Sequence, residues 1–460
     1  MVGSPRHCFL CVIAGLVLLV GLTLLPQEAA AAEQWKAGVA KANITPETFM
    51  WMSGYGSRNH PAEGKDTDLW GKVLVLEDPA GNRAVLITLD LVGIDRALSQ
   101  GICAGLEQKY GLKRQQVALN CSHTHSGPVV SRNLQSMYVM LDETQKKLIA
   151  EYTQTLEEKV IATVGTALEK LMPANFSWGS GKATFAVNRR TNVENNVPAL
   201  RAAGQLKGPN DHDVPVLAVR SPDGKLLAVT FGYACHSTVL PFYNWSGDYP
   251  AYAQIELERA YPDCTALFWA GCGADQNPIP RREVALAQHY GKTLAQSVAA
   301  IIDAPMTPIA GTLGLTYQEV DLALDTLPTK EQIEQDAQSK DKYVASRAMN
   351  LLAQINAGKP LSQTYPYPVG TWKLGDQVEW VFLGGEVVVD FAVRIKGERA
   401  GTKTWVAGYS HDVMAYIPSR RVLTEGGYEG AGAMVYYGLP TSWSPAVEET
   451  IMQEVQRQAK

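Results

Sequence analysis

The chain has 460 residues, of which 46% are hydrophobic and 19% are charged. This is ordinary globular composition, with ample material for a large buried core. The net charge is -5 at pH 7 and no block of lysine and arginine residues occurs, which argues against nucleic acid as a partner.

The first 32 residues have the pattern of a secretory signal peptide. A short basic start precedes an apolar run from Phe9 to Leu25, and the small-residue exit QEAAAA predicts cleavage after Ala32. A retained membrane anchor is the alternative, but the apolar run is short for a membrane span. No later stretch is apolar for long enough to cross a bilayer. We therefore predict an exported protein, periplasmic or extracellular, whose mature chain makes at most peripheral contact with membranes.

Seven cysteines occur in the chain, and Cys8 and Cys11 lie in the leader. The others are Cys103, Cys121, Cys235, Cys264 and Cys272. An odd number of cysteines, so few in a long chain, does not indicate a disulfide scaffold. Two interpretations fit: one bridge, such as Cys264 to Cys272, or buried free thiols that pack as small apolar side chains.

Short β-rich runs that end in polar side chains occur throughout the chain. In order they are RAVLITLD, ending at Asp90; QQVALNCSHTH, ending at His123 and His125; LLAVTFGYACH, ending at His236; TALFWAGCGAD, ending at Asp275; EWVFLGGE, ending at Glu386; and TWVAGYSHD, ending at His411 and Asp412. Their density of branched and aromatic residues suits buried strands. Ligands of open α/β sheets bind at the carboxyl ends of strands, so these endings predict a site assembled there.

Helical patterns lie between these runs. Apolar residues recur every four positions from Leu148 and predict a long amphipathic helix that ends before Pro173. Pro250 lies in the first turn of a second helix, which Ser246 or Asp248 can cap. Further helices are predicted over 281–303 and 329–356.

Alternating strands and helices predict an α/β fold with a layered, mostly buried mixed sheet flanked by helices. No linker divides residues 33–460, so we expect a single large catalytic domain. Residues 304–375 are a candidate insertion, because their middle is charged and helical and the loop-like stretch PLSQTYPYPVG follows it.

Several of the strand endings could carry chemistry. On an extended backbone residues i and i+2 point to the same side, so the H-x-H pair of His123 and His125 can present two imidazoles to one cavity. Neutral imidazole is a good zinc ligand, yet the pair alone fits a hydrogen-bonded turn better. Taken alone, His236 fits a core histidine, Glu386 a carboxylate at a helix start and Tyr428 a surface tyrosine in a glycine-rich loop.

The motifs together resemble the neutral/alkaline, non-lysosomal ceramidase family, and more closely its short bacterial members of unassigned substrate. The resemblance extends from Lys36 to Gly438. The motifs occur in the family's order: AGVAKANITP, MSGYG, SHTHSGP, FAVNRR, YACHSTVL, SGDYP, GGE and GYEGA.

The resemblance implies a zinc amidohydrolase with one Zn²⁺ at the base of a pocket. The zinc ligands that it implies are His123, His236, Glu386 and Tyr428. His125 would face the substrate and shuttle a proton, and Arg189 and Tyr437 would hold the scissile carbonyl.

The implied chemistry is consistent with these residue types. Two imidazoles and one carboxylate leave Zn²⁺ with a net positive charge, which acidifies water and allows zinc-activated water to attack an amide carbonyl. Arg189, Tyr437 or His125 would stabilise the oxyanion, and His125 would protonate the leaving amine. Buried acids could orient the liganding histidines; the candidates are Asp90, Asp275 and Asp248, although Asp248 could instead cap its helix.

Two departures from the family pattern stand out. Where true ceramidases carry a serine proposed as a nucleophile, this chain has Gly271, so no serine acyl-enzyme route carries over. The adjacent Cys272 is a weak substitute, because no histidine is its sequence neighbour. Longer ceramidases also carry a C-terminal β-sandwich domain, whereas this chain ends at Lys460, soon after YYGLP.

We therefore expect a secreted zinc-dependent hydrolase of a linear amide, with ceramide or another N-acyl compound as its small-molecule or lipid substrate. One alternative keeps the zinc but cleaves an ester, a lactone or a glycan-linked amide. Another is a binding protein without turnover, which the presence of every implied ligand argues against.

Overall fold

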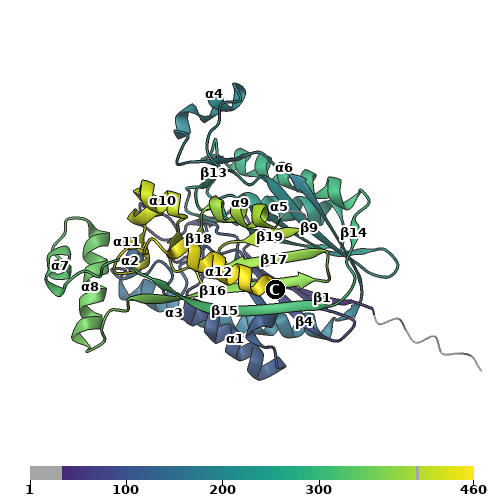
Figure 1. Cartoon of the computed structure of the whole chain (residues 1–460), viewed down its shortest axis with the longest axis horizontal. Coiled ribbons are helices and arrows are strands. Elements are labelled where there is room, and N and C mark those ends of the chain that lie inside the picture. Colours follow the sequence, from purple (N-terminus) through teal and green to yellow (C-terminus); the bar gives the residue numbers. More distant parts are fainter. Residues whose placement is uncertain (1–33, 400–402) are drawn as a thin grey trace, which may run out of the picture. The chain divides into compact units, whose positions relative to one another are not determined.

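Residues 34–399 and 403–460 are described by a computed structural model, so the predicted leader, residues 1–32, lies outside the described part (Figure 1). These residues form three main β-sheets with helices packed against them. Within these ranges no helix has both the length and the apolar character needed to cross a membrane. The predicted α/β class is confirmed, but the strands are divided among several sheets instead of one.

The first sheet is antiparallel except at one edge. Its strands in spatial order are β5 (Val117–Cys121), β4 (Arg83–Leu89), β3 (Trp70–Glu77), β1 (Lys36–Asn43) and β6 (Met172–Pro173), and only β4 and β5 pair in parallel. The helix α1 (Arg96–Tyr110) connects these two strands, and α3 (Glu143–Glu169) packs against β1 and β3. Because parallel strands need a crossover connection, α1 follows directly from the pairing.

The second sheet repeats this arrangement. Its order is β12 (Thr265–Ala270), β10 (Leu226–Tyr233), β9 (Asp213–Arg220), β7 (Asn175–Lys182) and β14 (Thr307–Pro308). The parallel pair is β10 and β12, connected by α5 (Asp248–Ala260), and α6 (Val284–Ile302) packs against β7 and β9.

The third sheet has the order β15 (Leu313–Ala323), β16 (Thr364–Leu374), β17 (Val378–Leu383) and β19 (Thr404–Ala407). Here β17 and β19 pair in parallel, and α9 (Val389–Glu398) lies between them in the chain. The helix α12 (Val447–Ala459) packs against β15 and β16. Each sheet therefore ends in one strand–helix–strand unit.

Shorter elements complete the described chain. The strand pairs are β2 (Gly64–Lys65) with β11 (Asn244–Trp245), β8 (Ala186–Asn188) with β13 (Gln276–Pro278), and β18 (Glu386–Val387) with β20 (Tyr416–Ile417). The remaining helices are η1 (Arg114–Gln116), α2 (Gln135–Tyr138), η2 (Glu194–Asn196), α4 (Val197–Ala202), α7 (Lys330–Asp336), α8 (Lys342–Asn356), α10 (Arg420–Glu425), η3 (Tyr428–Gly432) and α11 (Met434–Tyr437).

A core of large aromatic side chains joins the inner faces of the three sheets. Leu86 on β4, Trp269 on β12 and Trp380 on β17 belong to one buried cluster. The ring centroids of Trp269 and Trp380 are 5.2 Å apart, and Trp405 lies 5.2 Å from Trp380. Rings at this separation interact favourably beyond the area they bury, so the cluster holds the sheets together at their centres.

The carboxyl ends of the parallel strands meet at Asn120, a fully buried residue of β5. Its side-chain carbonyl accepts from Ala270 N at 2.9 Å, at the end of β12. Its amide donates to Gly408 O at 2.7 Å and to Ser410 Oγ at 3.1 Å, just beyond β19. One side chain therefore links the three sheets at the ends where the sequence predicts a site.

The predicted strands and most predicted helices are confirmed. All six β-rich runs contain strands, namely β4, β5, β10, β12, β17 and β19. The amphipathic helix is α3, which ends before Pro173, and α6 covers the helix expected over 281–303. The helix α5 begins at Asp248 after Gly247, and both predicted side chains bond its first turn: Ser246 Oγ accepts from Asp248 N at 3.1 Å, and Asp248 Oδ1 accepts from Tyr249 N at 2.7 Å. The five cysteines described are free and buried, so no bridge joins Cys264 to Cys272.

The predicted helix over 329–356 is two helices, α7 and α8. The carboxylate of Asp341 accepts from the backbone nitrogens of Tyr343 and Val344, so it starts α8 as a separate helix. The candidate insertion 304–375 is also narrower than expected, because β15 and β16 pair along their whole length within the third sheet. Only residues 324–363 leave the sheet, and α8 packs against α2 and α11 (Figure 1).

The Asn120 link predicts a large effect on stability. Replacing Asn120 by Ala leaves Ala270 N without its side-chain partner inside a dry core, which should lower the free energy of unfolding by about 2–4 kcal/mol. Urea unfolding of Asn120→Ala measures this, and the exposed Asn195→Ala is the matched control, expected within about 0.5 kcal/mol of wild type. Equal stability of Asn120→Ala and the control would contradict the role of the link.

Asp412 predicts a pH dependence of stability. Burial, with Asp95 nearby, raises the pKa of Asp412 to about 7, while the Tyr365 hydroxyl donates to the carboxylate at 2.5 Å and opposes the rise. The unfolded carboxyl titrates near about 3.9, so its stabilisation is complete below that pH and is lost as pH rises through about 7. Relative to wild type, Asp412→Asn should gain stability between about pH 4 and 7 and stay level above it. Chemical unfolding across pH measures the difference, and a flat difference would contradict the prediction.

Candidate metal centre and active site

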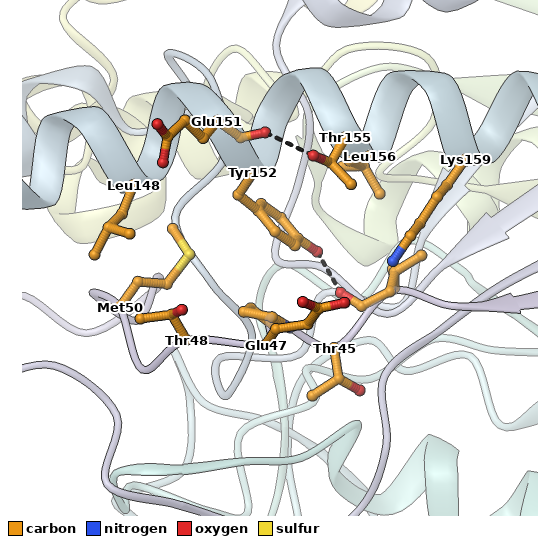
Figure 2. Close-up of a pocket in the computed structure, with 12 residues that line it drawn as sticks. Thr45, Glu47, Thr48, Met50, Leu148, Glu151, Tyr152, Thr155, Leu156 and Lys159 are labelled. Atoms are coloured by element: carbon orange, nitrogen blue, oxygen red, sulfur yellow. Dashed lines mark hydrogen bonds between the residues drawn. The ribbon is translucent and has the colours of Figure 1, made fainter.

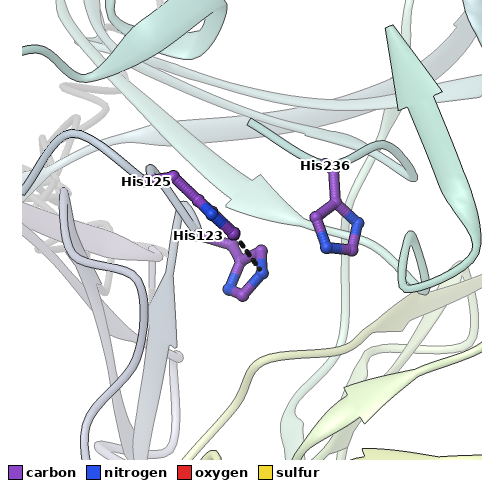
Figure 3. Close-up of side chains that lie close together, drawn as sticks. All are labelled: His123, His125 and His236. Atoms are coloured by element: carbon purple, nitrogen blue, oxygen red, sulfur yellow. Dashed lines mark hydrogen bonds between the residues drawn. The ribbon is translucent and has the colours of Figure 1, made fainter. Parts of the chain in front are cut away.

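Three imidazoles from two segments that are far apart in sequence lie together at the carboxyl ends of the first two sheets (Figure 3). His123 and His125 follow β5, and His236 follows β10. One ring nitrogen of each lies within 4.8 Å of the others, and the Nε2 atoms of His123 and His125 are 3.1 Å apart. The sequence predicts His123 and His236 as metal ligands, and the structure brings these side chains to one place.

Main-chain carbonyls determine which nitrogen of each buried imidazole faces the site. His123 Nδ1 donates to Val92 O at 2.6 Å, and His236 Nδ1 donates to Gly273 O at 2.8 Å. Because a carbonyl can only accept, each Nδ1 carries the proton and leaves Nε2 with a free lone pair when the ring is neutral. Burial, reinforced by Arg189, lowers the pKa of His236 to about 4, so this ring is neutral at pH 7.

Glu386 brings a carboxylate to the same point from the third sheet. Its Oε2 lies 3.1 Å from His123 Nε2 and 3.2 Å from His236 Nε2. Its Oε1 accepts a hydrogen bond from the Tyr437 hydroxyl. Burial alone would raise the pKa of Glu386, but positive charge at His123 and His236 opposes burial and holds the pKa well below its usual value. The buried carboxylate stays ionised only beside positive charge, which protonated imidazoles or a cation held between the three groups would supply.

This donor set fits a bound cation. Glu386 Oε2 has no hydrogen-bond donor among the described residues, and when both rings are neutral, with their Nδ1 protons on the main-chain carbonyls, the two Nε2 atoms that face it carry lone pairs. Three lone pairs in a buried cluster repel one another unless a positive charge lies between them. A tetrahedral Zn²⁺ site with ligands about 2.0 Å from the metal places the ligand atoms about 3.3 Å apart, close to the separations found here.

His123 reaches the site through a turn and not through an extended backbone. Its φ is 58°, in the left-handed region, and β5 ends before it at Cys121. The premise that the H-x-H pair is extended is therefore wrong, although both imidazoles reach one cavity. His125 N donates to Ser237 O at 3.2 Å, which ties the turn to the chain after β10. Strained conformations of this kind concentrate at functional sites.

Two tyrosines close the cavity around Glu386. Burial and the charge of Glu386 raise the pKa of Tyr437 well above its usual value, so its phenol stays protonated as the donor to that carboxylate. Tyr428, on the π-helical turn η3, lines the same cavity and is half exposed. Its ring lies 5.3 Å from that of Tyr416. The structure thus brings Tyr428 to the site, with its hydroxyl not hydrogen-bonded to the histidines or to Glu386.

Arg189 does not contact the imidazoles directly. The Tyr416 hydroxyl lies between Arg189 and His236 and contacts both. Arg189 pairs with Glu429 at 2.7 Å and donates to the Tyr416 hydroxyl at 3.2 Å. That hydroxyl lies 3.3 Å from His236 Nε2. Sequence reasoning missed Tyr416 and Glu429. The only signal for Tyr416 is tertiary, because it is paired across from Glu386 in the short sheet of β18 and β20.

The buried acids predicted to orient the histidines instead accept hydrogen bonds from the main chain. Asp90 accepts from Trp70 N at 2.9 Å, Asp248 accepts from Leu240 N at 2.9 Å, and Asp275 accepts from Val389 N at 2.9 Å. None bonds an imidazole of the cluster, because the Nδ1 atoms of His123 and His236 already face main-chain carbonyls. These carboxylates satisfy backbone N–H groups at the start of β3, in the segment after β10 and at the start of α9.

The residues at the position of the family's serine do not offer a nucleophile. Cys272 is fully buried, and burial raises the pKa of its thiol far above neutrality. A Cβ at Gly271 would lie 3.1 Å from Ala234 Cα, so a larger side chain there would press on the main chain of the neighbouring segment. The histidine cluster is the better candidate for the chemistry.

A separate hollow of about 240 Å³ lies between α3 and residues 44–50 (Figure 2). Tyr152 crosses it and donates to Ile44 O at 2.7 Å. No histidine or cysteine lines this hollow, so it does not include the cluster of His123, His125 and His236. We assign it no part in the chemistry.

Comparison with known proteins agrees with this geometry. The sequence profile described as neutral/alkaline non-lysosomal ceramidase, N-terminal, matches residues 35–278. A neutral ceramidase of Drosophila melanogaster is 23% identical over 233 residues, covering 49% of this chain and 32% of the relative. Neutral ceramidase 1 of Arabidopsis thaliana is 24% identical over 263 residues, covering 56% of this chain and 33% of the relative. The chain thus spans about a third of the length of these curated relatives.

A solved structure extends the likeness beyond the matched segment. The crystal structure of neutral ceramidase from Pseudomonas aeruginosa superposes with a TM-score of 0.70 at 20% sequence identity, and covers 92% of this chain and 73% of that one. The shared fold includes the third sheet, which supplies Glu386 and lies beyond the matched profile. The profile covers more than half of the chain, and on this ground the chain belongs to the neutral/alkaline non-lysosomal ceramidase family.

Proposed function

We propose that this chain is an exported, zinc-dependent amidohydrolase that cleaves the amide bond of an N-acyl compound, ceramide or a similar molecule. The observation that carries the proposal is the convergence of His123 Nε2 and His236 Nε2 on Glu386 Oε2, at 3.1 Å and 3.2 Å, with no hydrogen bond to that oxygen among the described residues. Membership of the ceramidase family supports amide hydrolysis as the reaction. The leader-like sequence of residues 1–32 supports export.

His123, His236 and Glu386 would hold the metal, and Tyr428 would complete the set from η3. Zinc, when bound, supplies a Lewis acid that polarises the scissile carbonyl and acidifies water. The protonated Tyr437 hydroxyl fixes the orientation of Glu386, so the carboxylate keeps its free oxygen directed at the imidazoles. This arrangement is prepared before any substrate enters.

Charge that develops on the carbonyl oxygen requires donors close to the imidazoles. The hydroxyl of Tyr416 lies in this region, and the guanidinium of Arg189 donates to it at 3.2 Å. Tyr437, which the sequence predicts to hold the carbonyl, donates its one hydroxyl proton to Glu386 and would orient that carboxylate instead. The ion pair with Glu429 holds Arg189 in place. Burial lowers the pKa of Arg189, but Tyr416 and Glu429 outweigh burial and raise the pKa well above its usual value. Donors fixed in this way stabilise an oxyanion without reorganising.

His125 is the group best placed to move a proton. Burial, and then His123 and His236, lower its pKa well below the usual value, so the ring is neutral and can accept a proton. Its Nδ1 has no hydrogen-bond partner among the described residues. A neutral His125 can take a proton from the attacking water and return it to the leaving amine, as a general base and then a general acid.

The metal assignment predicts the zinc content of purified variants. Wild-type protein should retain about one zinc per chain, and His123→Ala and His236→Ala should each lower zinc affinity by more than about 100-fold, because each removes a direct ligand. Elemental analysis after dialysis measures this. The exposed His289→Ala on α6 is the matched control. Full zinc retention by both cluster variants would contradict the assignment.

The role of His125 predicts lost turnover with metal retained. Purified protein should release free amine from a panel of N-acyl lipids, stop when a chelator removes the metal, and recover with zinc. His125→Ala should lower kcat by about 100- to 10,000-fold while keeping wild-type zinc content. Loss of zinc from this variant would instead make His125 a ligand, and unchanged kcat would remove it from the mechanism.

A further inference from the structure

Three hollows share the side chain of Tyr55, whose ring lies 4.7 Å from that of His125. The metal cavity, about 170 Å³, contains His123, His125 and Glu386 in its walls. A second hollow of about 620 Å³ shares Gly54, Tyr55 and His125 with that cavity, and we call it the charged arm. A third of about 140 Å³ shares Tyr55, Gly56 and Met137 with it, and we call it the apolar arm.

The charged arm is walled by ions of both signs. Arg190 pairs with Glu429 at 2.6 Å and with Glu425 at 3.0 Å, and Arg281 pairs with Glu194 at 2.8 Å. Fixed ion pairs of this kind present hydrogen-bond donors and acceptors to an incoming group, and they do not favour a hydrocarbon chain, which would remove water from them.

The apolar arm has the opposite character. Its walls are mainly aromatic and aliphatic, and include Trp51, Met137, Leu141 and Tyr343. Two cationic side chains also line this arm. Lys342 is exposed, whereas Arg58 is buried: its terminal nitrogens donate to Ser53 O at 2.6 Å and to Phe242 O at 3.0 Å, and its Nε has no partner among the described residues. A hydrocarbon group that enters this arm therefore meets apolar surface without displacing a hydrogen bond of Arg58.

The position of His125 determines which part of an amide enters each arm. Its side chain faces the charged arm as well as the metal cavity, and does not line the apolar arm. In the proposed reaction His125 protonates the leaving amine, so the amine lies on the charged side of Tyr55. The acyl group then lies on the apolar side.

We propose that this enzyme prefers amides that join a compact acyl group to a polar amine, held astride Tyr55 with the acyl group in the apolar arm. This inference rests on the proposed function. An apolar cavity of about 150 Å³ takes up benzene, so an arm of about 140 Å³ accommodates an acyl chain of about six carbons. Two long hydrocarbon chains do not match the pair of arms.

Tyr343 limits the length of the apolar arm. It lies near the start of α8, in the segment that leaves the third sheet, and its hydroxyl donates to Gly56 O. Its ring packs edge-on against Tyr436, with centroids 5.1 Å apart. Ser346 on the same helix donates to Ser136 O at 2.7 Å, which holds α8 against this side of the site. The segment 324–363 thus carries a determinant of acyl-chain length.

The test uses zinc-loaded protein and two amide series: serinol acylated with chains of 2, 6, 12 and 16 carbons, and sphingosine acylated with the same chains. For the serinol series kcat/KM should rise about fourfold per methylene up to about six carbons and then level off or fall. The sphingosine amides should be no better substrates than the serinol amides. Tyr343→Ala should move the maximum toward 12 carbons.

Matched variants distinguish an effect of the size of the apolar arm from an effect of damage to the fold. Tyr343→Phe keeps the ring and should keep the wild-type profile, as should Met349→Ala, an exposed residue of the same helix. Met137→Ala enlarges the arm from its other wall and should move the maximum in the same direction as Tyr343→Ala. A rate that climbs to the 16-carbon sphingosine amide in wild type, or a profile that neither enlarging variant moves, overturns this inference alone. Failure to cleave any amide overturns the proposed function and this inference with it.

Discussion

The amide of Asn120 joins strands from all three sheets at their carboxyl ends, and the position of the site depends on that junction. Its bonds to Ala270, Gly408 and Ser410 satisfy a buried polar group that would otherwise destabilise the core. Each sheet provides one parallel strand pair, and one member of each pair leads into His123, His236 or Glu386. His123, His236 and Glu386 can converge only because these three ends are held together.

The two imidazoles and the carboxylate of Glu386 lie close together in a buried place. Main-chain carbonyls, and not carboxylates, bond the Nδ1 atoms of these histidines. The carbonyls of Val92 and Gly273 take the Nδ1 protons, which leaves the Nε2 lone pairs facing ionised Glu386. A buried anion next to two lone pairs is unfavourable on its own and becomes favourable around a cation. A cation held in this cluster should therefore stabilise the folded chain, because the unfolded chain has no such cluster.

The segment 324–363 leaves the third sheet and contributes a wall near the cavity, but it contains none of His123, His236 and Glu386. The strands β15 and β16 enclose it, and their pairing anchors both of its ends. Its helix α8 packs against α2 and α11, and brings Tyr343 to a wall that Gly56 and Met137 share with the metal cavity. Variation in such a segment can alter which substrate enters while the cluster stays constant.

Much of the secondary structure could be predicted, since it depends on neighbours in sequence. The six buried strands are continuous apolar runs, and α3 follows from its four-residue periodicity. The break between α7 and α8 was missed, because the polar stretch QSKD between them contains no glycine or proline, and the bonds made by Asp341 reveal the second start. The division into three sheets was missed as well, because strand partners lie far apart along the chain and local patterns do not identify them.

The sequence by itself determined the residue types and their order: strand ends that carry His123, His125, His236 and Glu386, and motifs that place the chain beside the ceramidases. Only the tertiary structure decided how these groups act. It bent the H-x-H pair through a left-handed turn at His123, gave the orienting bonds to main-chain carbonyls instead of Asp90 and Asp275, and placed Tyr416 against His236. The reason is that ligand types are properties of single residues, whereas proton positions, donors and cavity walls arise from contacts between segments that only packing brings together.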